Sequence, residues 1–303
     1  MDQGLIESVR RFNRTVTQRI GALDESFLSR GRPLGQARVL WEIGQGGTRV
    51  RALRSRLGLD SGYLSRLLRA LEADGLIVVS AAEGDRRVRA VRLTQPPQAE
   101  HAELDRRSDD MAAAILGPLT VRQRGRLTAA MDEAERLLTA SMIRVAAADP
   151  RHPNARYCLR AYFTELSRRF DNGFDPDRSI PAEDRDLTPP AGVLLVATLH
   201  DESVGCGALR YHGDAPAEVK RMWVSPAVRG LGLGRRLLAE LEALAVAHGV
   251  RTLRLETNRA LTEAIDLYRS AGYQEVSAFN TEPYAHHWLE KTLAPDGPRA
   301  PAT

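Results

Sequence analysis

The stretch Met222-Trp-Val-Ser-Pro-Ala-Val-Arg-Gly-Leu-Gly-Leu-Gly-Arg-Arg-Leu-Leu238 decides the fold of the second half of the chain. A strand-forming apolar start leads into a turn with three glycines, and then into leucines at helical spacing. Glycines let the backbone approach a ligand closely, and the N–H groups at a helix start have no partner within the helix. The turn therefore suits a diphosphate, and Arg229 and Arg235 add positive charge beside it.

Three phosphate-binding motifs compete for this turn, and two of them fail. A P-loop ends in Gly-Lys-Ser/Thr, whereas Gly234 is followed by two arginines. A Rossmann fingerprint has Gly-x-Gly-x-x-Gly after the first strand of a βαβ unit, whereas the spacing here is Gly-x-Gly-x-Gly after antiparallel strands. The third motif is an Arg-x-x-Gly-x-Gly/Ala turn, which the segment Arg229–Gly234 matches in its context.

The segments around the turn alternate between strand and helix patterns. They predict helices over 155–170, 235–248 and 262–270, strands over 193–200, 205–211, 218–224 and 253–257, and a final strand pair within 273–292. Small residues and prolines over 146–153 predict a linker before this α/β domain. The proline-rich end of the chain predicts a disordered tail over 294–303.

Residues 154–293 resemble the GNAT N-acetyltransferases. The resemblance rests on the glycine turn and on Ala264-Ile-Asp-Leu-Tyr-Arg-Ser-Ala-Gly-Tyr273, which is similar to the family's Leu-Tyr-x-x-x-Gly-Phe/Tyr segment. It implies a mixed, mostly antiparallel sheet in which strands 218–224 and 253–257 splay apart to admit acetyl-CoA. Leu261 stands where the family often has Asn, which leaves Asn258 as the nearest asparagine. The acetyl-CoA contacts implied in this way are Met222, Trp223, Val224, Arg229, Gly230, Leu231, Gly232, Leu233, Gly234, Arg235 and Asn258.

Acetyl transfer to an amine needs a base for the amine and an acid for the departing thiolate. An amine of pKa ~10.4 must be neutral to attack, and a phenol of pKa ~10 can donate a proton to a thiolate of pKa ~8.5. We expect Tyr268 to be the acid, and we consider Glu218, Glu256 and Glu165 as bases, with alternation along a strand unable to say which points inward. A backbone N–H near Val224 is the expected oxyanion donor. The expected substrate-pocket residues are Glu165, Asn280, Glu282 and Tyr284.

The first half of the chain has a different pattern. Helices are expected over 4–28, 35–44, 48–57, 61–74 and 98–145, the last interrupted near Gly117-Pro118, with strands over 77–80 and 88–94. We expect Thr48 and Asp60 or Ser61 to cap the third and fourth helices, and two short helices followed by a two-stranded ribbon make a winged helix-turn-helix. Its leucines bury one face of helix 61–74, and the opposite face and the ribbon tip are expected to contact DNA. The DNA-contacting candidates are Ser61, Tyr63, Ser65, Arg66, Arg69, Arg86 and Arg87.

Residues 1–145 resemble the MarR family of transcription regulators. The resemblance rests on Leu64-Ser-Arg-Leu-Leu-Arg-Ala-Leu-Glu-Ala-Asp-Gly-Leu-Ile77 and on Asp85-Arg-Arg-Val-Arg-Ala-Val-Arg-Leu-Thr94, which is similar to the family's wing signature. It implies a homodimer formed through the first and last helices, which reads a pseudo-palindromic duplex.

Length and composition agree with a two-domain globular chain. The 303 residues are 43% hydrophobic and 27% charged, and no apolar run is long enough to span a bilayer. Residues 1–145 carry a net charge of +6 and the remainder −2, which suits a polyanion partner for the first half. Two cysteines are too few for a structural zinc site, so we expect no metal. Because no long apolar run and no signal-peptide pattern is visible, we also expect no membrane partner and a cytoplasmic location.

These observations predict a fusion of two activities. A DNA-binding regulator over 1–145 would precede an acetyl-CoA-dependent N-acetyltransferase over 154–293, which modifies a primary amine on a small molecule, peptide or protein. The alternative is a regulator whose second domain binds acetyl-CoA only as a signal, without catalysis. A third possibility is an acetyltransferase whose first half only dimerises.

Overall fold

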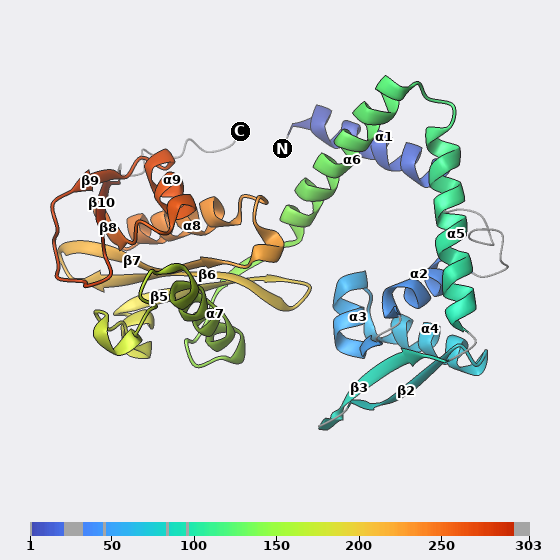
Figure 1. The fold of residues 1–303 in the computed structure, drawn as a ribbon, viewed down its shortest axis with the longest axis horizontal. Coiled ribbons are helices and arrows are strands. Elements are labelled where there is room, and N and C mark those ends of the chain that lie inside the picture. The colour runs from blue at the N-terminus through green and yellow to red at the C-terminus, as the bar shows by residue number, and fades with distance from the viewer. Residues whose placement is uncertain (1, 21–32, 45–46, 83–84, 95–96, 294–303) are drawn as a thin grey trace. The chain divides into compact units, whose positions relative to one another are not determined.

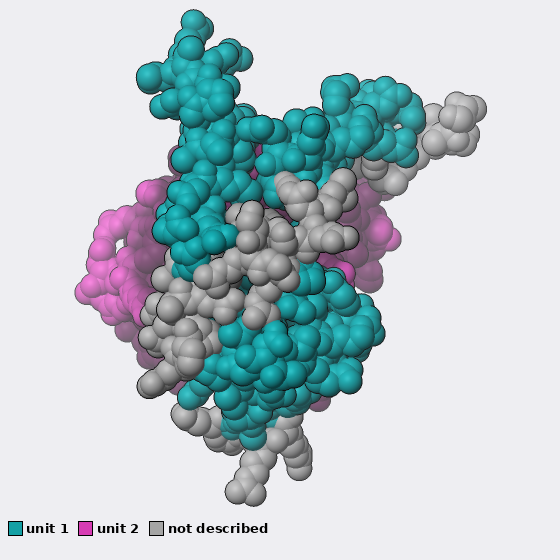
Figure 2. Space-filling model, turned by 90° about the vertical axis from the view of Figure 1, so that its right-hand side faces the viewer, with its two compact units in different colours: residues 1–133 teal, residues 134–303 magenta. Residues whose placement is uncertain are grey.

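The computed structural model describes residues 2–20, 33–44, 47–82, 85–94 and 97–293, and they form two compact units, 1–133 and 134–303 (Figures 1 and 2). The predicted tail over 294–303 lies outside the described residues. Within the described ranges, no helix is both long and apolar enough to cross a membrane.

The first unit contains the expected winged helix-turn-helix. Its elements are α1 (Gln3–Arg19), α2 (Leu34–Ile43), β1 (Thr48–Arg49), α3 (Val50–Leu57), α4 (Ser61–Ala73), β2 (Ile77–Ala82), β3 (Asp85–Leu93) and α5 (Pro97–Leu116). Four leucines of α4 are buried with the apolar faces of α2 and α3, because they recur on one face of the helix. Asp60 caps α4 by accepting a hydrogen bond of 2.8 Å from the backbone N–H of Tyr63, as expected.

Two expectations for this unit were wrong in detail. Thr48 does not cap a helix, because Thr48 and Arg49 pair with Val91 and Ala90 as a third strand beside the ribbon, and α3 starts after them. Gly47 has a φ of +71°, a conformation that glycine adopts readily and that turns the chain toward β3. The first helix ends at Arg19, and most of the remaining residues predicted for it, 21–28, lie outside the described residues.

The second unit is a seven-stranded sheet in the order β4-β5-β6-β7-β8-β10-β9. Its strands are β4 (Arg144–Ala147), β5 (Gly192–Leu199), β6 (Glu202–His212), β7 (Ala215–Val224), β8 (Thr252–Thr257), β9 (Gln274–Val276) and β10 (His287–Thr292). β7 and β8 are parallel and the other pairs are antiparallel, so the sheet is mixed and mostly antiparallel as expected. Helix α7 (Pro153–Arg169) packs on one face, and α8 (Leu233–Ala247) and α9 (Thr262–Ser270) pack on the other (Figure 1).

The helical region expected over 98–145 is interrupted near Gly117-Pro118 as predicted, between α5 and α6, but its end and the start of the expected linker over 146–153 differ from the structure. Helix α6 (Val121–Met142) ends earlier, and Arg144–Ala147 pair with β5 as the edge strand of the second unit's sheet. The buried side chain of Ile143 packs in the core of that sheet, which draws the chain into it. Two of the three alanines that suggested a linker, Ala146 and Ala147, are therefore strand residues.

Candidate functional site

The central feature of the second unit is a gap between β7 and β8. In the described sheet these strands pair at two positions, Ala217 with Leu253 and Glu218 with Arg254, and they diverge beyond Glu218. The register of β7 against β6 shifts between Lys220 and Trp223, where Arg221 has a φ of +58°. Such a bulge increases the local twist of a strand, which turns the end of β7 away from β8. The gap has the position that the GNAT resemblance implied.

The glycine turn lies at the start of α8, beside the open end of β7. Gly230 and Gly232 have φ values of +82° and +76°, which explains why glycine stands at both positions. Gly232 is the N-cap of α8 and no side chain caps the helix, so its first N–H groups remain available to an anion.

A cleft of about 660 Å³ runs from this turn along the open end of β7 to α9. Of the eleven predicted acetyl-CoA contacts, nine line it: Met222, Trp223, Val224, Arg229, Gly230, Gly232, Leu233, Gly234 and Arg235. Leu231 packs against the hydrophobic core instead. Asn258 lies in a neighbouring pocket, where its Nδ2 donates to the Tyr284 carbonyl over 2.7 Å. The size of the cleft and the uncapped helix start fit coenzyme A.

Glu165 lies in this cleft, next to the glycine turn. Its two carboxylate oxygens accept hydrogen bonds of 2.6 Å from the Arg229 guanidinium, and one of them also accepts a 3.0 Å bond from the Trp223 indole. The sequence predicts Glu165 on the substrate side of the site. The structure places it where a diphosphate would approach Arg229.

Replacing Glu165 with Gln should strengthen coenzyme A binding about fivefold, which corresponds to ~1 kcal/mol for one partly exposed ion pair. The neutral amide would release Arg229 and would not repel a diphosphate. Isothermal titration with coenzyme A at fixed salt measures this, and Glu240→Gln on α8, whose carboxylate pairs with Arg236 outside the cleft, is the control. Unchanged or weaker binding would mean that Glu165 orients Arg229 rather than competing with the ligand.

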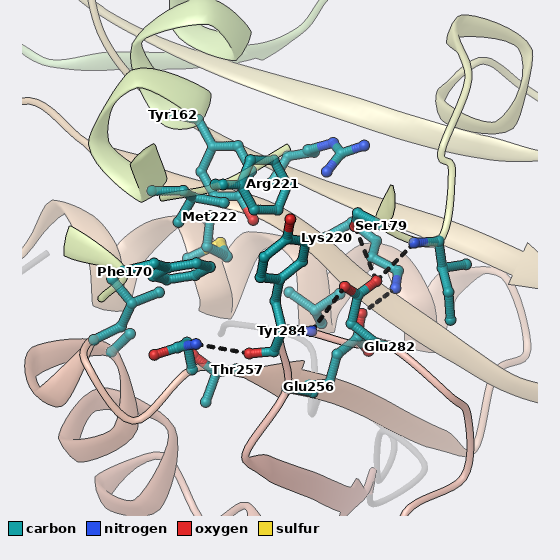
Figure 3. A pocket seen from close by; sticks show the side chains of 18 of the residues that line it. Tyr162, Phe170, Ser179, Lys220, Arg221, Met222, Glu256, Thr257, Glu282 and Tyr284 are labelled. Atoms are coloured by element: carbon teal, nitrogen blue, oxygen red, sulfur yellow. Dashed lines mark hydrogen bonds and ion pairs between the residues drawn. The ribbon is translucent and has the colours of Figure 1, made fainter. Parts of the chain in front are cut away.

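A second, smaller pocket of about 80 Å³ adjoins the cleft (Figure 3). The rings of Tyr162, Phe170, Phe174 and Tyr284 line one part of it, and Lys220 and Glu256 line another. Six residues border both the pocket and the cleft: Tyr162, Leu166, Met222, Leu261, Ala264 and Tyr268. The two cavities therefore meet beside Tyr268.

The Tyr268 side chain is buried at this junction. Among the described residues, none forms a hydrogen bond with its hydroxyl group, which leaves the group available to a ligand. Burial raises the pKa of Tyr268 well above the ordinary range, and Tyr162 and Glu256 add to the effect. The phenol is consequently protonated at neutral pH.

The structure separates the other candidate bases. Glu256 lines the smaller pocket, where its carboxylate accepts hydrogen bonds from Lys220 and, over 3.4 Å, from Asn280 Nδ2. Glu218 lies outside both cavities, in the part of β7 that is still paired with β8. Burial would raise the pKa of Glu218, but Lys220, His212 and Arg254 outweigh it and hold this pKa below its ordinary value.

Of the predicted substrate residues, Glu282 and Tyr284 line the smaller pocket, Glu165 lines the cleft, and Asn280 lines neither cavity but contacts Glu256. Asn280 bridges Glu256 and the Trp288 indole, which donates to it over 2.8 Å. The carboxylate of Glu282 is engaged by Ser179 Oγ at 2.9 Å and by the Ile180 N–H at 2.7 Å, so its role is to hold the loop. Tyr284 contributes its ring to the aromatic wall.

Sequence reasoning missed the rest of that wall and the lysine. Tyr162 lies in α7 and Phe170 is the residue that ends this helix, whereas Phe174 lies in the loop that follows. Their spacing gave no period that points to a pocket. Lys220 could have been noticed in the sequence, because it is one of two lysines in the chain and lies two residues after Glu218, on the same face of the predicted strand.

In the first unit, five of the seven residues predicted to contact DNA lie on α4. Ser61, Tyr63, Arg66 and Arg69 are exposed on it, and Ser65 is half-buried. The Arg66 guanidinium stands 5.7 Å from the Tyr63 ring, and Arg69 Nε donates to the Ser65 carbonyl over 3.2 Å. Arg86 and Arg87 lie at the start of β3, but their side chains are outside the described part of the structure.

Comparison with known proteins agrees with both halves of this picture. Residues 190–275 match the acetyltransferase (GNAT) domain model, and residues 30–88 match the MarR family model. The IAA acetyltransferase of Azospirillum brasilense is 36% identical over 116 residues, which cover 38% of this chain and 76% of that protein. An uncharacterized N-acetyltransferase of Schizosaccharomyces pombe is 36% identical over 105 residues, which cover 34% of this chain and 61% of that protein.

Solved structures include a GNAT-family acetyltransferase from Staphylococcus aureus that is 17% identical, with a TM-score of 0.44 over 50% of this chain and 99% of that one. The sequence matches carry the assignment, because one curated relative is covered over most of its length at more than a third identity. The chain belongs to the GNAT acetyltransferase family, and its GNAT domain follows a MarR-family winged helix-turn-helix.

Proposed function

We propose that the second unit transfers the acetyl group of acetyl-CoA to a primary amine. The observation that carries this proposal is the junction of the two cavities at Tyr268, with the glycine turn on one side and Glu256 on the other. The cleft accommodates the diphosphate and pantetheine, which brings the thioester to the junction. The smaller pocket accommodates the amine, with Glu256 at its polar end.

The proposed reaction has three proton transfers around one acyl transfer. Glu256 accepts a proton from the ammonium form of the substrate, and the free amine attacks the thioester carbonyl, with the oxyanion held by a backbone N–H near Val224. As the C–S bond breaks, Tyr268 donates its proton to the thiolate and regains one from the nitrogen of the new amide. The raised pKa of Tyr268 does not prevent this step, because a thiolate in the same buried junction is destabilised by the same desolvation.

The experiment is a screen of the purified full chain with acetyl-CoA. Four amines, spermidine, tyramine, glycylglycine and a lysine-containing peptide, would be tested for thiol release together with IAA, which the name of the Azospirillum brasilense relative mentions. Mass spectrometry would identify the product. An acetylated amine supports the proposal. Tight acetyl-CoA binding without turnover on any acceptor, together with an altered DNA affinity, would instead indicate a sensor of acetyl-CoA.

We propose that the first unit binds double-stranded DNA as a homodimer. The exposed residues of α4 support the DNA contact, and an apolar face on α1 supports dimerisation. Leu5, Val9 and Phe12 of α1 are 62%, 60% and 52% exposed, and their spacing places them on one side of the helix. A face of this kind is covered in a stable protein, and a second copy of the chain is the partner implied by the resemblance. Analytical ultracentrifugation of the full chain tests the dimer.

Replacing Arg66 and Arg69 together with Ala should weaken binding to a random-sequence duplex and reduce the slope of log affinity against log salt by about 2. Each arginine lost removes one phosphate or base-edge contact and its counterion release. Fluorescence anisotropy at several salt concentrations measures both quantities. The double variant Arg259→Ala, Arg269→Ala in the second unit changes the charge equally and should leave both unchanged. Unaltered binding by the first variant would remove α4 from the DNA interface.

A further inference from the structure

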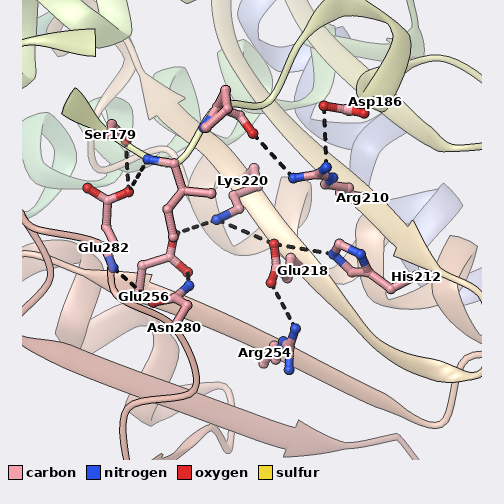
Figure 4. Close-up of polar contacts among 12 residues, drawn as sticks. Ser179, Asp186, Arg210, His212, Glu218, Lys220, Arg254, Glu256, Asn280 and Glu282 are labelled. Carbon is pink, nitrogen blue, oxygen red and sulfur yellow. Dashed lines mark hydrogen bonds and ion pairs between the residues drawn. The ribbon is translucent and has the colours of Figure 1, made fainter. Parts of the chain in front are cut away.

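A row of charged side chains leads from the smaller pocket to the protein surface (Figure 4). It starts at Glu256 in the pocket wall, continues through Lys220 and Glu218 of β7, and ends at His212 of β6. The side chains of the first three are 10%, 8% and 7% exposed, whereas that of His212 is 28% exposed. The row thus leads from the wall of the smaller pocket to a partly exposed histidine.

Successive members of the row lie within ion-pair distance of each other. Lys220 Nζ donates to Glu256 and stands 3.4 Å from Glu218 Oε2. The same Glu218 oxygen stands 3.4 Å from His212 Nε2. Arg254 Nη2 donates to the other Glu218 oxygen over 3.0 Å, which leaves Oε2 to face both the lysine and the histidine.

His212 is the unusual member of the row. Its Nε2 atom is buried and makes no hydrogen bond to any described residue, although Glu218 is within ion-pair distance. A buried polar atom without a partner is rare and calls for an explanation. The charged groups around it are Glu218 and Lys220 of β7 and Arg254 of β8. Arg210 of its own strand is engaged by Asp186 and the Pro181 carbonyl.

Burying these charges has a cost that packing alone does not offset. Two carboxylates, a lysine and an arginine balance each other, yet apolar residues of similar size would often be at least as stable at such positions. The row runs along one face of the sheet because Glu218 and Lys220 are two apart on β7. Stability alone therefore does not account for the row of buried charges.

The proposed acetyl transfer releases one proton for each turnover. An ammonium and acetyl-CoA give an amide, coenzyme A with its thiol protonated, and one proton that was on the ammonium. Glu256 receives that proton in the wall of the smaller pocket, and it must lose the proton before the next cycle.

We infer that Lys220, Glu218 and His212 carry this proton from Glu256 to solvent. The inference rests on the proposed function. The Lys220 ammonium first gives a proton to Glu218, and the neutral amine then takes the proton from protonated Glu256, so the lysine is an ammonium before and after. Glu218 then passes the proton to His212 Nε2, and the imidazolium releases one to water. Every bond broken is matched by one formed, and no other reactant is needed.

The test follows proton release and thiol release in one turnover of the full chain, with the fastest acceptor from the five-compound screen and a pH indicator in weak buffer. In the wild type the two signals should coincide. In His212→Ala, proton release should lag thiol release about tenfold, and thiol release over many turnovers should slow because Glu256 stays protonated. About 10–50 mM imidazole should restore that multiple-turnover rate, which is followed by thiol release alone because imidazole buffers the proton signal. His212→Gln, which keeps a polar side chain, should behave like His212→Ala.

The matched control is His248→Ala. His248 stacks on Tyr211 with 4.1 Å between ring centroids and lies outside the row, so its loss should change neither signal nor the multiple-turnover rate of thiol release. Thermal unfolding of each variant separates a proton-transfer defect from misfolding. Proton release that keeps pace with thiol release in both His212 variants would overturn the inference while leaving the acetyltransferase proposal intact. Absence of thiol release from the wild type with every acceptor would overturn both.

Discussion

Replacing Tyr268 with Phe should lower kcat for acetyl transfer by about 100-fold or more, which is the usual loss when a general acid is removed. The variant keeps the ring that fills the junction of the two cavities and loses only the hydroxyl group. Coenzyme A affinity should stay within about twofold of the wild type, since no described side chain depends on that hydroxyl for a hydrogen bond. Initial rates of thiol release and titration with coenzyme A measure the two quantities separately.

Tyr273→Phe is the matched control for this prediction. Tyr273 is also buried, its ring centroid is 5.9 Å from that of Tyr268, and it lines neither the cleft nor the smaller pocket. Its variant should keep wild-type turnover. Wild-type turnover in Tyr268→Phe would contradict the role of general acid, and a parallel loss of coenzyme A binding would indicate a structural role instead.

Replacing Glu256 with Gln should lower kcat/KM at pH 7 by about 100- to 1,000-fold, because the amine would then have no base within the pocket. The loss should shrink as the pH rises toward the pKa of a free amine, ~10.4, since a growing fraction of the substrate arrives neutral. A profile of kcat/KM from about pH 6 to 10 checks both the size of the loss and its direction with pH.

The control carboxylate is Glu240, which is exposed on α8 and pairs with Arg236. Glu240→Gln should reproduce the wild-type profile. A Glu256→Gln profile that runs parallel to the wild type, only lower, would assign Glu256 to substrate binding rather than to proton removal.

The main features of the fold could be read from the sequence because each depends on local chemistry. Helices α4 and α8 and the glycine turn follow from leucine spacing, Asp60 and positive-φ glycines, which act within a few residues. The strand at 144–147 could not be predicted, since Arg144–Ala147 has little strand preference of its own and takes its conformation from β5. The prediction that Thr48 caps a helix was wrong for the same reason, because its strand partner Val91 is 43 residues away in the sequence.

The candidate site was predictable only in part. The turn residues and Tyr268 belong to continuous motifs, and the structure places all of them but Leu231 in the cleft wall. Which glutamate could act as the base depended on where β7 and β8 diverge, and the alternation of side chains along a strand does not contain this information. Glu218 lies in the paired segment, whereas Glu256 lies beyond it. The aromatic wall and the loop held by Glu282 join residues about 100 positions apart, such as Ser179 and Glu282.

The strand at Arg144–Ala147 decides how the two units can be expressed apart. A truncation that starts at the proline-rich segment Asp149–Pro153 would leave β5 as the outermost strand, with a row of backbone donors and acceptors and the apolar residues Val193–Ala197 beside it. Such an edge recruits further strands from other molecules, and the fragment would aggregate. A soluble fragment has to retain Ile143 and the strand after it.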